Sequence, residues 1–131
     1  MASVHREIVV GRPAAAVWDA LADVGALHTR LVRGFVTDCR LEAGARVVTF
    51  ANGMVARELI VDVDPERRRV AWAVVGGRLS HHNASAQAFA AGDAACRIVW
   101  IADFLPDEHA PQVAAMIEQG LAAMKTTLEI G

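Results

Sequence analysis

Apolar and polar residues alternate along most of the chain between residues 35 and 105, which is the pattern of half-buried β-strands. Turn signals containing Gly, Pro or Asn separate six such segments, expected over residues 35–41, 46–51, 55–64, 69–75, 79–90 and 95–105. A shorter segment of the same kind is expected over 4–10. The pattern predicts one N-terminal strand and an antiparallel meander of six strands.

Helical spacing appears in two other parts of the chain. Pro13 suits a first helical turn, and it precedes apolar residues at intervals of three and four, namely Val17, Trp18, Leu21 and Val24. A second short helix is expected over 26–32. These segments predict two short helices directly after the first strand.

The C-terminal region predicts one long helix. Asp107 and Glu108 favour a helix start, and a single apolar stripe follows, made of Val113, Ile117, Gly120, Leu121, Met124 and Leu128. A long helix with one apolar stripe must pack against a large apolar surface, and only the sheet offers one. The expected class is therefore α+β, a single domain over residues 1–131 in which a curved antiparallel sheet wraps around the C-terminal helix.

Composition narrows the class of partner and the cellular location. The net charge is −2 with no block of like charge, which argues against nucleic acid as a partner. No signal peptide and no apolar run of membrane-spanning length is visible, so no membrane insertion and a cytoplasmic location are expected. Cys39 and Cys96 lie far apart in apolar strands, which favours two buried thiols over one disulfide. Monomer and homodimer both remain open.

The order of elements resembles the START/Bet v 1-like helix-grip fold, and specifically the SRPBCC group that includes polyketide cyclase/dehydrase-like proteins. The resemblance is carried by PAAAVWDALAD at 13–23, by VDVDPERR at 61–68, and by the closing strand and helix. It covers essentially the whole chain. It implies a deep apolar cavity between the sheet and the long helix, used for lipids, polyketides or other hydrophobic molecules, in a group that holds both enzymes and carriers.

The strand expected over 79–90 is unusual because every second residue is polar and most residues between them are alanine. If the turns are tight, Trp72 lies opposite His81, and Ser85 lies opposite Trp100. One face then combines aromatic and polar groups, which is the usual make-up of a small-molecule site. With two helix residues added, the predicted ligand-binding set is Arg57, Trp72, His81, Asn83, Ser85, Trp100, Phe104, Met116 and Gly120.

Two of these residues also suggest chemistry. His81 suits proton transfer near neutral pH, although a hydrogen-bonded pocket histidine is the simpler interpretation. Arg57 is expected to meet a ligand carboxylate or enolate. Because neighbours in a strand point to opposite faces, His81 and His82 do not form a metal site, and no metal is expected. A pair between His82 and Asp103 is expected on the outer face.

The chain contains no nucleophile elbow, phosphate-binding glycine loop, dinucleotide fingerprint or CxxC motif, so no cofactor is expected. The first hypothesis is a protein that binds a hydrophobic small molecule of lipid, polyketide or aromatic type. The alternatives are a cyclase, dehydratase or isomerase that uses His81 for proton transfer, and a protein-interaction module with no ligand.

Overall fold

The computed structural model describes residues 2–130 and confirms the expected order of elements. The elements are β1 (Ala2–Val10), α1 (Ala14–Ala22), the π-helical turn η1 (Leu27–Leu31), β2 (Val36–Glu42), β3 (Ala45–Phe50), β4 (Val55–Asp64), β5 (Arg69–Val75), β6 (His81–Ala90), β7 (Cys96–Leu105), the 3₁₀ turn η2 (Asp107–His109) and α2 (Ala110–Ile130). The strand expected from residue 79 begins at His81.

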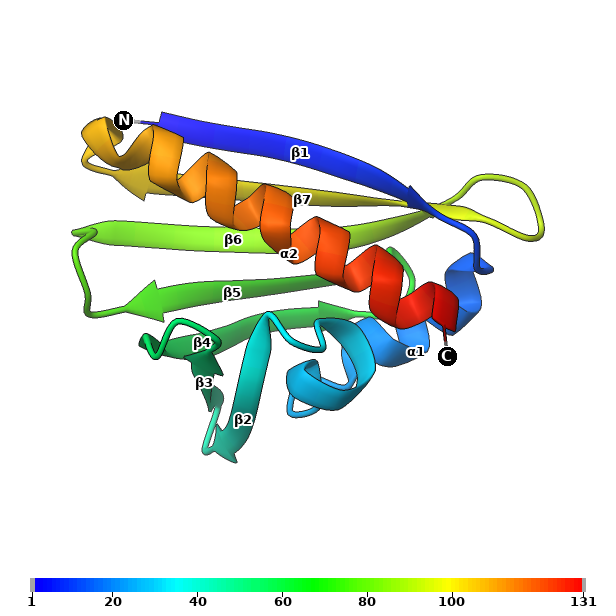
Figure 1. Ribbon diagram of the computed structural model, residues 1–131, viewed down its shortest axis with the longest axis horizontal. Helices are drawn as coiled ribbons and strands as arrows, with labels where there is room; N and C mark the ends of the chain where they lie inside the picture. Colours follow the sequence, from blue (N-terminus) through cyan, green and yellow to red (C-terminus); the bar gives the residue numbers. More distant parts are fainter. Residues whose placement is uncertain (1, 131) are drawn as a thin grey trace.

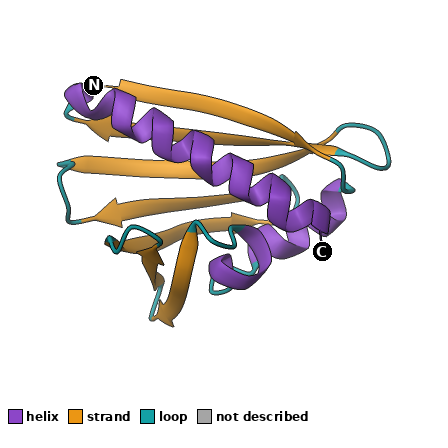
Figure 2. Ribbon diagram, viewed as in Figure 1, coloured by secondary structure: helices purple, strands orange, loops and turns teal. Residues whose placement is uncertain are grey.

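The seven strands form one antiparallel sheet in the order β1-β7-β6-β5-β4-β3-β2. The long helix α2 runs obliquely across one face of this sheet, and α1 lies near its C-terminal end (Figure 1). Figure 2 shows the same arrangement as one long helix laid over the strands. We call the face toward α2 the inner face and the opposite one the outer face. This is the helix-grip fold, as predicted.

The core lies between the inner face and the helices. Its buried members on β5, β6 and β7 include Val70, Trp72, Ala84, Ala86, Ala88, Ile98, Trp100 and Phe104. Ala84, Ala86 and Ala88 of β6 all point inward, and their small size lets α1 pack close to this strand. The alanines between the polar residues of 79–89 are therefore core residues.

Every turn of the meander from β3 to β7 differs in length from the tight turns assumed for the sequence. Between β3 and β4, Phe50 N donates to Met54 O, so the hairpin loop closed by this pair has three residues, 51–53, and its Gly53 takes the left-handed conformation. Five residues separate β5 from β6, so Trp72 lies opposite Ala84 and not His81. The pairings of β3 with β4, β5 with β6 and β6 with β7 are each shifted by an odd number of residues, and so is the pairing of β4 with β5 between Arg57 and Ile60.

An odd shift exchanges the two faces of the next strand, and two odd shifts restore them. The predicted inner residues of β3, β5 and β7, such as Val48, Trp72 and Trp100, are therefore inside. The predicted inner residues of β4 and β6 are on the outer face. A bulge between Ile60 and Asp62 shifts the register of β4 once more before its end.

Cys39 and Cys96 are both free and buried, as expected. They lie on β2 and β7, which four other strands separate. Among residues 2–130, no helix is both long enough and apolar enough to span a membrane.

Candidate functional site

The predicted ligand-binding residues divide between the two faces of the sheet. Trp72, Trp100, Phe104 and Gly120 are buried on the inner side. Met116 is half-buried one helical turn before Gly120 and packs against the core. Arg57, His81, Asn83 and Ser85 lie on the outer face, so their expected placement beside the tryptophans is wrong. The cause is the odd shift at each turn.

The outer-face residues bond mainly with one another. His81 Nε2 lies 2.6 Å from Asn83 Oδ1, and Asn83 Nδ2 donates to Asp103 Oδ2 over 3.1 Å. Ser3 also donates to Asp103. Because Asp103 lies opposite Asn83, the expected pair between His82 and Asp103 does not form.

Arg57 and Ser85 also lie on the outer face, Arg57 in an exposed ion pair and Ser85 beside a surface hollow. Arg57 pairs with Glu42 at 3.3 Å, with about half of each side chain exposed. Asn83 and Ser85 border a hollow of about 600 Å³ on the outer face, together with Ala71, Ile101 and Asp103. His81, Asn83 and Arg57 therefore already have protein partners, and Ser85 faces the outer side of the sheet.

The inner face carries a buried ion pair that the sequence pattern did not reveal. Arg46 on β3 lies opposite Glu58 on β4, and Arg46 Nε donates to Glu58 Oε1 over 2.8 Å. Only 4% of the Arg46 side chain and 9% of the Glu58 side chain are exposed. Arg46 Nη1 also donates to Val24 O, and the guanidinium lies 5.2 Å from the Trp72 ring centre. Burial raises the pKa of the Glu58 carboxyl, against the opposing effect of the Arg46 charge.

Four aromatic rings lie on the inner side of the sheet, between this ion pair and α2. Trp72 and Trp100 pack edge to face, with ring centres 5.8 Å apart. Phe35 and Phe50 form a second such pair at 5.5 Å and are only half-buried. Gly120 joins the pairs: a Cβ built there would lie 2.5 Å from the Trp100 ring and 3.4 Å from the Phe35 ring. We call these four rings, with Gly120 between them, the inner aromatic cluster.

One polar atom of this cluster has no protein partner. The indole Nε1 of Trp100 is buried and forms no hydrogen bond with any described residue. Trp100 as a whole is only 8% exposed. Buried N–H groups in folded proteins are nearly always paired, so a donor of this kind calls for an explanation.

His82 is the histidine of strand β6 that faces inward. Its ring packs edge to face on Phe104 at 6.3 Å, whereas its neighbour His81 is exposed. Burial, and to a lesser degree the charge of His81, lowers the pKa of His82. Proton transfer at the inner face would therefore use His82 and not His81.

The sequence contained one signal for the ion pair. Arg46 and Glu58 are opposite charges in two successive strands that the Asn52-Gly53 turn joins. A three-residue loop at this turn brings the two charges opposite each other, whereas a two-residue loop does not. In the described part of the chain, no three His, Cys, Asp or Glu residues gather to hold a metal ion.

The fold and this inner surface define a helix-grip protein with an aromatic, partly polar inner face. Residues 1–129 match the family model described as polyketide cyclase / dehydrase and lipid transport. The chain belongs to this family. No curated protein matches the chain by sequence.

Solved structures of the same fold come from bacteria and a plant. An uncharacterised protein from Bacillus thuringiensis has a TM-score of 0.86 at 14% identity, covering 97% of this chain and 98% of that one. Norcoclaurine synthase from Thalictrum flavum, in complex with dopamine and hydroxybenzaldehyde, has a TM-score of 0.76 at 19% identity, covering 98% and 84%. One further match is the di-domain ARO/CYC BexL of the BE-7585A biosynthetic pathway, with a TM-score of 0.77 at 16% identity, covering 98% of this chain and 47% of that one.

At these identities the structures establish the fold alone. Family and fold together support a ligand-binding or cyclase role for this chain.

Proposed function

We propose that this protein binds an aromatic or polyketide-type small molecule on the inner side of the sheet, against α2. The observation that carries the proposal is the buried, unpaired Nε1 of Trp100 within the inner aromatic cluster. An unpaired buried N–H costs about 1–3 kcal/mol, and a ligand oxygen that accepts its hydrogen bond recovers that cost. The ligand is therefore expected to carry a carbonyl, phenol or carboxylate oxygen at its buried end.

The surroundings of Trp100 suit a flat, apolar ligand. Binding sites for small molecules combine apolar walls with a few polar groups, here the indole N–H and the Arg46–Glu58 pair. Phe35 and Phe50 of the cluster are half-buried, and so is Met116, which packs against the core. Methionine is flexible and polarisable, so Met116 is suited to adjust to ligands of different shape.

The related structures support an aromatic ligand over an aliphatic lipid. The norcoclaurine synthase complex contains dopamine and hydroxybenzaldehyde, which are both small aromatic molecules with oxygen substituents. Edge-to-face and stacked ring contacts stabilise aromatic pairs beyond simple area burial. A lipid would gain less from the four rings of the inner aromatic cluster.

The test is an NMR titration of the ¹⁵N-labelled protein with hydroxybenzaldehyde. The three tryptophans give three indole N–H signals, which the single Trp→Phe variants assign. We expect the Trp100 signal to move most, and to move downfield as its N–H donates a hydrogen bond. Shifts confined to outer-face residues such as His81 and Asn83, or no shifts at all, would contradict the proposal.

A matched pair of variants locates the ligand. Val74 is half-buried on the inner face, and Val75 follows it on the outer face with 40% of its surface exposed. Val74→Phe should fill space on the inner side and weaken binding of the fluorescent probe 1-anilinonaphthalene-8-sulfonate about tenfold, whereas Val75→Phe should leave it unchanged. Thermal melts of both variants verify that they remain folded. Equal effects of the two variants would argue against an inner site.

Catalysis at the same face is the second candidate function, favoured by two titratable groups there. Burial raises the pKa of the Glu58 carboxyl, which is the direction that favours a general acid, and His82 is the inward-facing histidine. Dopamine and hydroxybenzaldehyde incubated with the protein should then give a condensation product that is lost in His82→Gln and retained in His81→Gln. Absence of product with the wild-type protein would exclude this reaction and leave a carrier.

A protein-interaction module remains the third function, and failure of all small-molecule probes would favour it. A cytoplasmic location and a monomeric or homodimeric state remain predictions. Native mass spectrometry of protein from its own source would report both a retained ligand and the oligomeric state.

A further inference from the structure

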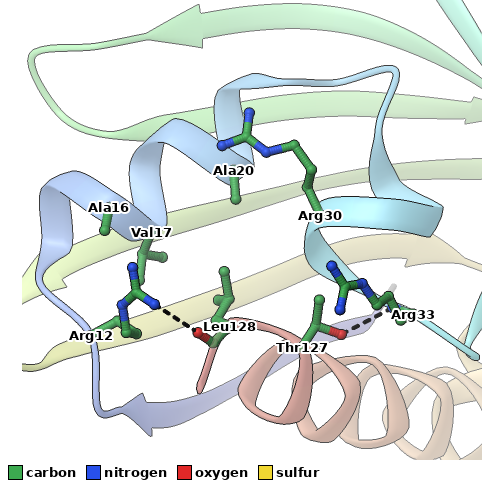
Figure 3. Close-up of a pocket in the computed structure, with 8 residues that line it drawn as sticks. All are labelled: Arg12, Ala16, Val17, Ala20, Arg30, Arg33, Thr127 and Leu128. Atoms are coloured by element: carbon green, nitrogen blue, oxygen red, sulfur yellow. Dashed lines mark hydrogen bonds between the residues drawn. The ribbon is translucent and has the colours of Figure 1, made fainter. Parts of the chain in front are cut away.

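A second pocket lies away from the inner aromatic cluster, where the C-terminal turns of α2 meet α1 and η1. Its volume is about 130 Å³, and Figure 3 shows the residues around it. Arg12, Arg30 and Arg33 approach it from three different segments, and the small or apolar residues Ala16, Val17, Ala20, Thr127 and Leu128 form the rest of its wall. We call it the arginine pocket. Thr127 is seven residues beyond Gly120, which is about 10 Å along a helix.

The charges around this pocket are not balanced. Arg30 is held by two carboxylates, Asp19 at 2.5 Å and Asp23 at 3.0 Å. Arg12 and Arg33 form no ion pair with any described residue. Among residues 2–130, the three guanidinium groups of the pocket are therefore paired with only two carboxylates, and those of Arg12 and Arg33 have no carboxylate partner.

Most side-chain hydrogen-bond donors of Arg12 and Arg33 have no acceptor within residues 2–130. Arg12 Nη1 donates to Leu128 O over 3.4 Å, and Arg33 Nε donates to Thr29 O over 2.6 Å. A guanidinium carries five N–H donors in a planar fork that matches the oxygens of phosphate and carboxylate groups. The bond from Arg12 also offsets the partial negative charge at the end of α2, which would otherwise repel an anion.

A buried hydroxyl adds a further donor to the pocket wall. Thr127 is 4% exposed, and its oxygen accepts a hydrogen bond from the backbone N–H of Arg33 over 3.0 Å. Among the described residues no acceptor takes the hydrogen of this hydroxyl. The pocket thus offers guanidinium and hydroxyl donors, and the carbonyl oxygen of Leu128 already accepts a hydrogen bond from Arg12.

The volume limits the size of the group that fits. At about 30 Å³ per water, the pocket has room for roughly four waters, or for one compact group of about five heavy atoms. A tetrahedral phosphate group is of this size, and its charge of about −1.5 to −2 at neutral pH complements the arginines. We propose that the arginine pocket binds a phosphate group, either free phosphate or the end of a phosphomonoester. This site is separate from the inner aromatic cluster and does not depend on the proposed function.

The test measures binding of inorganic phosphate, phenyl phosphate and chloride at matched ionic strength, by calorimetry and by the shift in melting temperature. Phosphate compounds should bind with a Kd below about 1 mM and raise the melting temperature, since a ligand that binds only the folded state stabilises it. Tighter binding of phenyl phosphate would identify a phosphomonoester as the source, and tighter binding of inorganic phosphate would identify the free ion. An equal response to chloride would overturn the proposal.

Two variants with matched controls test the location. Arg33→Gln should weaken phosphate binding at least fivefold, whereas Arg40→Gln, an exposed arginine on β2, should leave it unchanged. Ala16→Leu should block the pocket without changing charge, and Ala15→Leu, at the exposed neighbouring position, should not. Wild-type affinity in both Arg33→Gln and Ala16→Leu would refute the site.

Discussion

The buried pair between Arg46 and Glu58 allows the sharpest test of how the inner face is built. Breaking a buried ion pair by removing one partner costs about 3–5 kcal/mol, because the other charge is left without compensation. An exposed pair contributes about 0–1 kcal/mol. The exposed fractions of 4% and 9% place Arg46–Glu58 in the first class, whereas 46% and 42% place the control pair Arg57–Glu42 in the second.

Arg46→Met should therefore remove a large part of a total stability that is about 5–15 kcal/mol for a typical domain. For a chain of 131 residues, we expect the melting temperature to fall by about 10–20 °C. Arg57→Met should lower it by no more than a few degrees. The double variant Arg46→Met/Glu58→Leu should recover most of the loss, because it leaves no buried charge. Thermal unfolding gives the melting temperatures of all four proteins, and urea unfolding gives their free energies of unfolding, both followed by tryptophan fluorescence.

The pH dependence provides a second readout. In Arg46→Met the lowering influence of the arginine is gone, so burial raises the pKa of Glu58 further above its unfolded value of 4.5. A raised carboxyl pKa favours the folded state below about pH 4.5, and this advantage is lost as the pH rises through the folded-state pKa. The deficit of Arg46→Met relative to wild type should thus shrink as the pH falls toward 4.5. A deficit below about 1 kcal/mol, or one independent of pH, would refute this account of the pair.

Three further predictions test other parts of the structure. Gly120→Ala should destabilise the protein by about 1–3 kcal/mol despite the better helix propensity of alanine, because its Cβ would lie 2.5 Å from the Trp100 ring; a higher melting temperature would contradict this. The pKa of His82 should lie below 6.5 in an NMR pH titration. The neutral form of His82 favours the folded state, so this contribution to stability should be lost as the pH falls from 6.5 through the folded-state pKa. A pKa above 6.5 would contradict the burial of His82. Burial raises the pKa of Cys39 and of Cys96. Both thiols should therefore react with Ellman's reagent only after denaturation. Rapid reaction of the native protein would show instead that the thiols are accessible.

Local patterns in the sequence were enough to predict the elements of this fold. Alternation identified the strands, and the apolar stripe from Val113 to Leu128 identified the long helix, since both depend on short-range periodicity. The inward position of Trp72 and Trp100 was also predicted correctly, but only because register errors cancelled in pairs. Two odd register shifts separate β3 from β5, and two more separate β5 from β7.

Which side of β4 and β6 faces the helix was decided only in the tertiary structure. The face of a strand is defined relative to its neighbour, so it depends on the number of residues in each turn. That number is settled by hydrogen bonds such as the one from Phe50 N to Met54 O. His81 therefore lies outside and His82 inside, and Arg46 and Glu58 become a buried pair. Their altered chemistry arises from desolvation, which requires distant segments of the chain to pack over them.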